Sequence, residues 1–247
     1  MLTKPLLTLY PVNDLTCRIA DLSVGIPATG EMSSRCRKYL AESTCRNVVL
    51  READYRLDSW PNLSYADAVY LESGMQFYIS LLHFNGLMLH ASAVALGGRA
   101  YLFSGPCGRG KSTHTRLWQD VFGECAQVFN DDKPALRRLD GRWYAYGTPW
   151  CGKDGINLNQ KWPLGGICFL EQARENRIRL LNAAEALPYF MAQTIYQLWP
   201  HEMDMLLASL DKLLQEVPVF LLENRPEEAA VRLSYETMRR AAEEEGL

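Results

Sequence analysis

The stretch Ser104–Trp118 reads SGPCGRGKSTHTRLW. It contains the pattern GxxxxGK[ST], whose fixed positions are Gly105, Gly110, Lys111 and Ser112. Glycines let a loop curl so that successive backbone N–H groups point inward at phosphate oxygens. A helix after the loop presents further free N–H groups and a partial positive charge to the same anion. The stretch therefore predicts a loop that binds a nucleoside triphosphate.

The surrounding sequence has the context that this pattern requires. The apolar run Arg99–Ser104 predicts a strand before the loop, and Lys111–Phe122 predicts a helix after it. We expect Lys111 to reach the outer phosphates and the Ser112 hydroxyl to bind Mg²⁺. The residues expected to bind the nucleotide are those of the loop and the first helical turn: Gly105, Cys107, Gly108, Arg109, Gly110, Lys111, Ser112 and Thr113.

Two adjacent carboxylates, Asp131 and Asp132, follow the predicted strand Ala126–Asn130. Neighbouring side chains on a strand point to opposite sides, so one carboxylate can face Mg²⁺ while the other faces an attacking hydroxyl. Metal binding needs only one acid, and the second is suited to act as a base in phosphoryl transfer. The alternative is an ordinary turn, which Asn and Asp both favour.

Composition excludes several classes of protein. The chain has 247 residues, of which 48% are hydrophobic and 22% charged, so a buried core is expected. A net charge of -3 argues against nucleic-acid binding. The longest apolar window, residues 78–96, contains His83, Asn85 and His90, which indicates a core segment and no membrane span. Seven scattered cysteines without a CxxC pair favour reduced thiols and a cytoplasmic location.

The order of apolar segments predicts an α/β fold. We expect a P-loop-containing mixed β-sheet core over 74–247, with C-terminal helices, and a small β-rich portion over 1–73 that begins with a strand over 1–11. The predicted helices are Met75–Phe84, Lys111–Phe122, Asn182–Trp199 with an interruption at Pro188, His201–Val217 with a one-sided apolar stripe, and Pro226–Ala241. The predicted strands are Val48–Leu50, Ala68–Leu71, Leu87–Leu96, Arg99–Ser104, Ala126–Asn130, a hairpin over Pro134–Gly147 that turns at Asp140–Gly141, Gly165–Gln172, Asn176–Leu181 and Val217–Asn224.

Three motifs carry a resemblance to a known family: LHASAV (Leu89–Val94), FSGPCGRGKSTHTRLW (Phe103–Trp118) and NDDKPAL (Asn130–Leu136). In this order they resemble the HPr kinase/phosphorylase family, and most of all the compact HPr-kinase-like proteins found beside peptide-modification genes. The resemblance spans about 87–176 and, more loosely, 217–233, and it implies a nucleotide-binding core shared with ATP-dependent phosphoenolpyruvate carboxykinase. The family's arginine-containing signature after the aspartates is missing, and the chain is too short for a carboxykinase. The resemblance therefore implies neither phosphorolysis nor decarboxylation.

The resemblance also implies roles for three residues. His90 matches the family's active-site histidine, Asp131 its general base and Asp132 its metal-binding aspartate. For His90, a hydrogen-bonded core histidine is the alternative. The glycine-rich segment 147–159 could close over the phosphates with Lys153 as a cation at the transferring group, or it is a surface loop with a solvated lysine. Arg116 could likewise meet the nucleotide or face water.

Together these observations predict an ATP- and Mg²⁺-dependent kinase. Its acceptor would be the hydroxyl of a serine in a peptide or protein, or of a small hydroxylated molecule. One alternative is an ATP-binding switch or accessory protein of a peptide-modification system, with little or no phosphoryl transfer. Another is plain nucleotide hydrolysis. A homo-oligomer is expected by family analogy alone.

Overall fold

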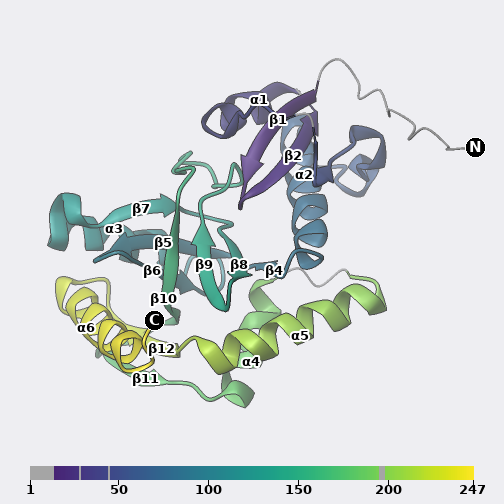
Figure 1. Cartoon of the computed structure of the whole chain (residues 1–247). Coiled ribbons are helices and arrows are strands. Elements are labelled where there is room, and N and C mark those ends of the chain that lie inside the picture. Colours follow the sequence, from purple (N-terminus) through teal and green to yellow (C-terminus); the bar gives the residue numbers. More distant parts are fainter. Residues whose placement is uncertain (1–13, 28, 44, 195–197) are drawn as a thin grey trace, which may run out of the picture.

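The computed structural model describes residues 14–27, 29–43, 45–194 and 198–247, and the strand predicted over 1–11 lies outside them. A nine-stranded mixed sheet forms the centre of the molecule (Figure 1). Its strands are β4 (Gly86–Met88), β5 (Ala91–Leu96), β6 (Arg99–Ser104), β7 (Gln127–Asn130), β8 (Ala135–Leu139), β9 (Arg142–Tyr146), β10 (Lys161–Gln172), β11 (Arg177–Leu180) and β12 (Val219–Asn224). The order is β4-β8-β9-β10-β6-β5-β7, with β12 paired to β10 and β11 to β12. The chain thus has the mixed α/β architecture that the sequence predicts.

The long strand β10 joins two parts of this sheet. Its residues 161–163 pair antiparallel with β9, whereas its later residues pair in parallel with β6 and β12. Residues 164–170 are buried, as expected for a strand that is covered on both faces. The change of partner along β10 curls the sheet.

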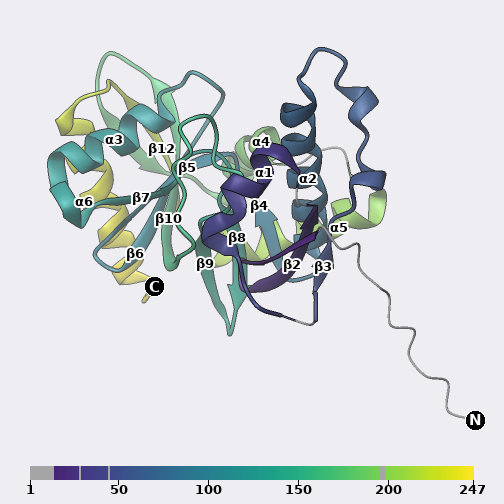
Figure 2. The same cartoon turned by 90° about the horizontal axis from the view of Figure 1, so that it is seen from above.

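Helices cover both faces of the parallel part of the sheet (Figures 1 and 2). Along β6, Ala100 and Leu102 pack with α4 (Ala183–Gln193) and α5 (Pro200–Glu216), whereas Tyr101 and Phe103 pack with α3 (Lys111–Phe122) and α6 (Glu228–Glu244). The predicted apolar stripe of α5 is confirmed, because its fully buried side chains are Leu206, Leu210 and Leu213. Among the described residues, no helix is both long and apolar enough to cross a bilayer.

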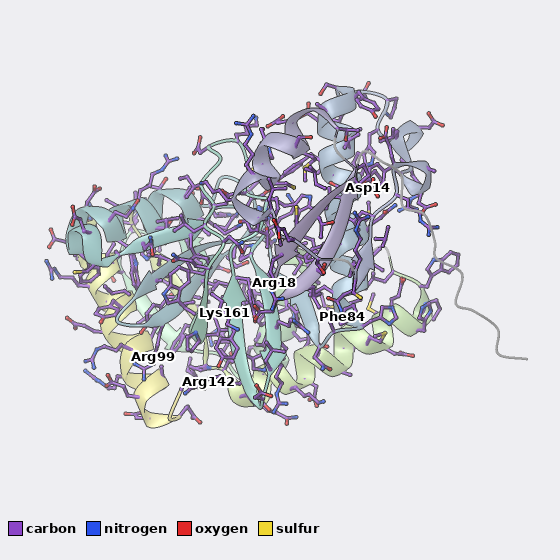
Figure 3. All side chains as sticks on the ribbon, turned by 45° about the horizontal axis from the view of Figure 1, so that its top comes forward. Asp14, Arg18, Phe84, Arg99, Arg142 and Lys161 are labelled. Carbon is purple, nitrogen blue, oxygen red and sulfur yellow. The ribbon has the colours of Figure 1, made fainter. Side chains whose placement is uncertain are left out.

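A small three-stranded sheet lies beside the large one (Figure 1). It consists of β1 (Asp14–Ile19), β2 (Leu22–Pro27) and β3 (Val48–Val49), accompanied by α1 (Gly30–Arg35), α2 (Tyr65–Leu82) and the short 3₁₀ helices η1 (Cys36–Tyr39), η2 (Glu52–Asp54) and η3 (Leu57–Ser59). Asp21 joins the two sheets, because its carboxylate accepts hydrogen bonds from Lys161 Nζ (2.5 Å) and Tyr146 Oη (2.9 Å). Arg18, which also pairs with Asp21 at 3.8 Å, lies beside Lys161 in Figure 3.

The end of the chain is held against the large sheet. The Arg99 guanidinium donates to the carbonyl oxygen of Leu247 at 2.8 and 2.5 Å. Arg142 donates to the carbonyl oxygen of Gly246 at 3.3 Å, and Figure 3 labels both arginines near α6. These bonds fix the C-terminal end of α6 across β6 and β9.

The helix α2 is longer than the sequence indicates. It begins at Tyr65, not at Met75, because Ser64 caps its N-terminus by accepting a hydrogen bond from the Asp67 amide (3.1 Å). The prediction of a strand over Ala68–Leu71 is therefore wrong, since those residues belong to this helix. The division into 1–73 and 74–247 stays a prediction, and its boundary falls inside α2.

Other elements differ in extent. The predicted strand Leu87–Leu96 is divided into β4 and β5. The predicted interruption at Pro188 is wrong, because α4 continues through it; a capping box between Asn182 and Glu185 fixes the start of this helix. The last helix begins at Glu228, after Pro226. The hairpin of β8 and β9, by contrast, forms as predicted.

Candidate functional site

Four chain segments meet at one edge of the large sheet. β6, β7 and β10 run in one direction and β5 runs in the opposite one, so the ends of the first three and the start of β5 share this edge. The edge brings together His90, the glycine loop 105–110 and the pair Asp131–Asp132.

The glycine loop connects β6 directly to α3. Gly108 and Gly110 have φ angles of 80° and 93°, a left-handed conformation that strains residues with a side chain. The Arg109 amide donates to the Pro106 carbonyl at 3.2 Å. Within the described residues, no acceptor is found for the amides of Cys107, Gly108 and Gly110. Together with the free N–H groups of the first turn of α3, they form a set of donors that suits an anion.

Lys111 lies over this loop. Its Nζ donates to the carbonyl oxygens of Gly105 (2.7 Å) and Pro106 (3.3 Å). Burial lowers the pKa of Lys111, and the nearby carboxylates of Asp131 and Asp132 partly offset that shift. The ammonium group is therefore held against the loop, within electrostatic range of the two acids.

A buried asparagine shapes the turn that carries the two acids. Asn130 Oδ1 accepts hydrogen bonds from the amides of Asp132 (3.2 Å) and Lys133 (2.9 Å), and its Nδ2 donates to the Thr148 carbonyl (3.1 Å). Such an Asx turn fixes the backbone two residues on. The sequence NDD is thus a turn, as its residue types indicate, and this turn presents both carboxylates at the sheet edge.

The carboxylate of Asp132 has several partners. Its Oδ2 accepts hydrogen bonds from Lys133 Nζ (2.5 Å) and Tyr70 Oη (3.1 Å). Its Oδ1 lies 3.4 Å from Nε2 of His90. A carboxylate has about four lone-pair sites, so Oδ1 keeps capacity for a further ligand.

Asp131 has the opposite surroundings. Its Oδ1 is buried and, among the described residues, has no hydrogen-bond partner. Buried polar atoms are nearly always paired, and an unpaired one costs about 1–3 kcal/mol. This oxygen therefore indicates a place for a hydroxyl donor or a cation.

His90 lies immediately before β5 and is held by α4. Its amide donates to the Gln193 carbonyl (2.7 Å), and its Nδ1 lies 3.1 Å from Gln193 Oε1. Burial lowers the pKa of His90, the charge of Lys111 lowers it further, and Asp132 acts in the opposite direction. These surroundings favour the neutral imidazole, and the His90 side chain, one-third exposed, borders the site.

Tyr70 and Arg35 belong to the site, although the sequence gives no local sign of either. The Tyr70 hydroxyl, besides donating to Asp132, accepts a hydrogen bond from the Gly152 amide (3.1 Å). Arg35 lies over the Tyr70 ring at 4.7 Å and donates to the Gly152 carbonyl (2.8 Å). Both come from the first 73 residues, in which the sequence contains no recognisable motif. Lys133 also belongs to the site, and its position directly after the two acids is the only sign of this in the sequence.

The segment 147–159 reaches the site through its backbone at Gly152. Lys153 is exposed and, within the described part of the chain, bonds to no site residue. Arg116 on α3 forms an ion pair with Asp154, which ties the segment to the helix that follows the glycine loop. Asn157 is buried, and its Oδ1 accepts from Lys38 Nζ at 3.1 Å.

The oxygen ligands at this edge fit Mg²⁺. The described residues include no group of three or more His, Cys, Asp or Glu side chains that could hold a metal by themselves. Mg²⁺ bound with a nucleotide uses one or two protein oxygens together with phosphates and water. Two protein oxygens of that kind lie here: the hydroxyl of Ser112, which is half-buried in the first turn of α3, and Oδ1 of Asp132.

Comparison with known proteins adds a distant likeness in fold. The sequence matches no protein-family profile and no curated protein. Among solved structures, the chain is similar to the HPr(Ser) kinase/phosphatase from Coxiella burnetii, with 14% sequence identity and a TM-score of 0.37. The match covers 61% of this chain and 97% of that one.

Proposed function

We propose that the chain is an ATP- and Mg²⁺-dependent kinase that transfers the γ-phosphoryl group to a hydroxyl of a peptide, a protein or a small molecule. The observation that carries the proposal is one juxtaposition. Among the described residues, a glycine loop with unpaired amides lies at the same sheet edge as Asp131, whose buried Oδ1 has no partner there either. An anion would satisfy the first group of atoms, and a hydroxyl donor would satisfy the second.

The loop would bind the triphosphate. Its free amides would donate to phosphate oxygens, and the helix α3 would present its positive end to the same anion. Lys111 would exchange the neutral carbonyls of Gly105 and Pro106 for charged phosphate oxygens. That exchange is favourable because hydrogen bonds between ionised groups are roughly twice as strong as neutral ones.

Mg²⁺ would be held by the Ser112 hydroxyl and Asp132, together with the phosphates. When bound, it would neutralise part of the negative charge on the phosphates. Tyr70 and Lys133 would keep the Asp132 carboxylate in place, because both bond to Oδ2 and leave Oδ1 toward the site.

Asp131 would accept the proton of the acceptor hydroxyl. A base must lie within hydrogen-bond reach of the proton that it removes. Asp131 is partly exposed at the end of β7, and its Oδ1 has no hydrogen-bond partner among the described residues, so this carboxylate would be free to act as the base. Loss of a general base costs about 10²–10⁴ in rate. The Asp131→Asn enzyme should therefore bind ATP while transferring phosphate about a hundredfold more slowly, or worse.

The test uses γ-labelled ATP, Mg²⁺ and soluble extract of the source cells, separated into small-molecule, peptide and protein fractions. Wild type is compared with Asp131→Asn and with the control Asp120→Asn, an exposed carboxylate on α3. Label in one fraction that disappears only with Asp131→Asn supports the kinase. Label found solely as free phosphate indicates hydrolysis, and label retained on bound ATP indicates a nucleotide-dependent switch.

A further inference from the structure

A cavity of about 430 Å³ adjoins the glycine loop on the side away from the two acids. Its walls come from three elements: the loop, the end of β10 and one side of α4. Its lining includes Pro106, Leu170, Glu171, Tyr189, Ala192 and Gln193. We infer that this cavity binds the nucleoside end of the triphosphate, an inference that rests on the proposed function.

The order of strands fixes which end of a triphosphate the cavity can receive. Across the sheet the order is β10-β6-β5-β7, and the loop follows β6. Asp131 and Asp132 follow β7, on one side of the loop, whereas the cavity lies at the end of β10, on the other side. A triphosphate stretched across the loop with its terminal phosphate toward the acids therefore has its nucleoside end at β10.

The lining suits a flat ring with polar edges. The Tyr189 ring is stacked on Phe169, with centroids 5.0 Å apart and planes at 28°, and its hydroxyl donates to Glu171 Oε1 at 2.8 Å. These contacts hold an aromatic surface in a fixed orientation, and aromatic rings stack favourably on nucleobases. Pro106 and Ala192 add apolar surface.

Polar groups are placed at the margin of this apolar surface. Gln193 is buried, and its Oε1 lies within hydrogen-bond distance of Nδ1 of His90. Gln193 therefore separates the cavity from the histidine beside Asp132. A small-molecule site typically combines an apolar lining with a few fixed polar groups, and this cavity has that composition.

The test separates the nucleoside from the phosphates. Isothermal titration in Mg²⁺ measures the affinity of the full chain for ATP and for inorganic tripolyphosphate. Ala192→Phe fills the cavity from an exposed position on α4, and Ala184→Phe, also exposed on α4 but away from the cavity, is its matched control. Lys111→Ala reports on the phosphate site.

Ala192→Phe should weaken ATP about tenfold or more and leave tripolyphosphate within about twofold, whereas Ala184→Phe should change neither. Lys111→Ala should weaken both ligands. Equal effects of Ala192→Phe on the two ligands, or no effect on ATP, would overturn the nucleoside assignment while the phosphate site stands. If Ala192→Phe lost phosphoryl transfer but kept its ATP affinity, the cavity would be a site for the acceptor, and the inference would be overturned as well. Wild-type protein that binds neither ligand would overturn the proposed function and this inference with it.

Discussion

Replacing Tyr70 by phenylalanine removes one oxygen atom that connects three parts of the molecule. The hydroxyl belongs to α2, donates to Asp132 Oδ2 and accepts from the Gly152 amide, both at 3.1 Å. Burial raises the pKa of Tyr70, so the group remains a protonated donor across the working pH range. The substitution tests whether the N-terminal third holds the acids in place.

The expected loss follows from the two bonds. A hydrogen bond to a charged group contributes about 1.5–3 kcal/mol, and an amide left without its acceptor costs about 1–3 kcal/mol. Lys133 stays on the same carboxylate oxygen, and Gly152 is half-buried, so water can replace part of the loss. We therefore expect Tyr70→Phe to lower the free energy of unfolding by about 2.5–4 kcal/mol, the lower half of the summed range.

Urea denaturation measures this change, and Tyr65→Phe is the matched control. Tyr65 lies on the same helix and donates to the carboxylate of Glu52, but its side chain is 56% exposed. An exposed bond of this kind contributes little, so the control should lose less than about 0.5 kcal/mol. ATP turnover should fall in Tyr70→Phe and not in Tyr65→Phe. Equal stability losses in the two variants, with turnover unchanged in both, would refute the role of Tyr70.

Two further predictions concern backbone strain and pH. Gly152→Ala and Gly155→Ala introduce a side chain at φ angles of 74° and 65°, and each should cost about 1–2 kcal/mol by that strain alone. Of the two, only the new Cβ at Gly152 meets a neighbour, the Cβ of Asp132 at 3.2 Å. Phosphoryl transfer should therefore fall in Gly152→Ala alone, and equal transfer rates in the two variants would contradict this. Burial lowers the pKa of His114 from its ordinary 6.5 to about 3, so the unfolded chain binds the proton first and stability falls as the pH drops from about 6.5 toward 3. His114 alone should contribute about 2 kcal/mol to the loss between pH 8 and pH 5, measured by denaturant titration. This contribution should be absent in His114→Gln and present in the exposed control His83→Gln. An unchanged loss in His114→Gln would show that another group titrates.

Local chemistry explains what the sequence could predict. The helix Lys111–Phe122 and the hairpin around Asp140–Gly141 form as expected, because a glycine turn and a regular apolar pattern mark each of them. The start of α2 was missed because its apolar run Ala68–Leu71 reads equally well as a strand, and the cap at Ser64 decides between the two. Pro188 does not break α4, since the capping box and the buried Phe190 secure the helix on both sides of it.

The same distinction holds for the site: short motifs identify some of its residues, whereas the tertiary fold brings in the others. The loop, the two acids and His90 could be named from motifs, because each motif lies within one short segment. Tyr70 and Gln193 reach the same edge from helices far away in the sequence, and only the tertiary fold brings them there. Their amino-acid types alone give no reason to select them among the other tyrosines and glutamines.

Calorimetric titration of the chain with ATP in Mg²⁺ shows directly whether the glycine loop is a nucleotide site. We expect one site per chain, with an affinity that falls about tenfold or more in Lys111→Ala. Lys212→Ala is the control, because that lysine is exposed on α5 and its side chain bonds to none of the described site residues. No ATP binding by the wild type, or equal binding by wild type and Lys111→Ala, would contradict the account.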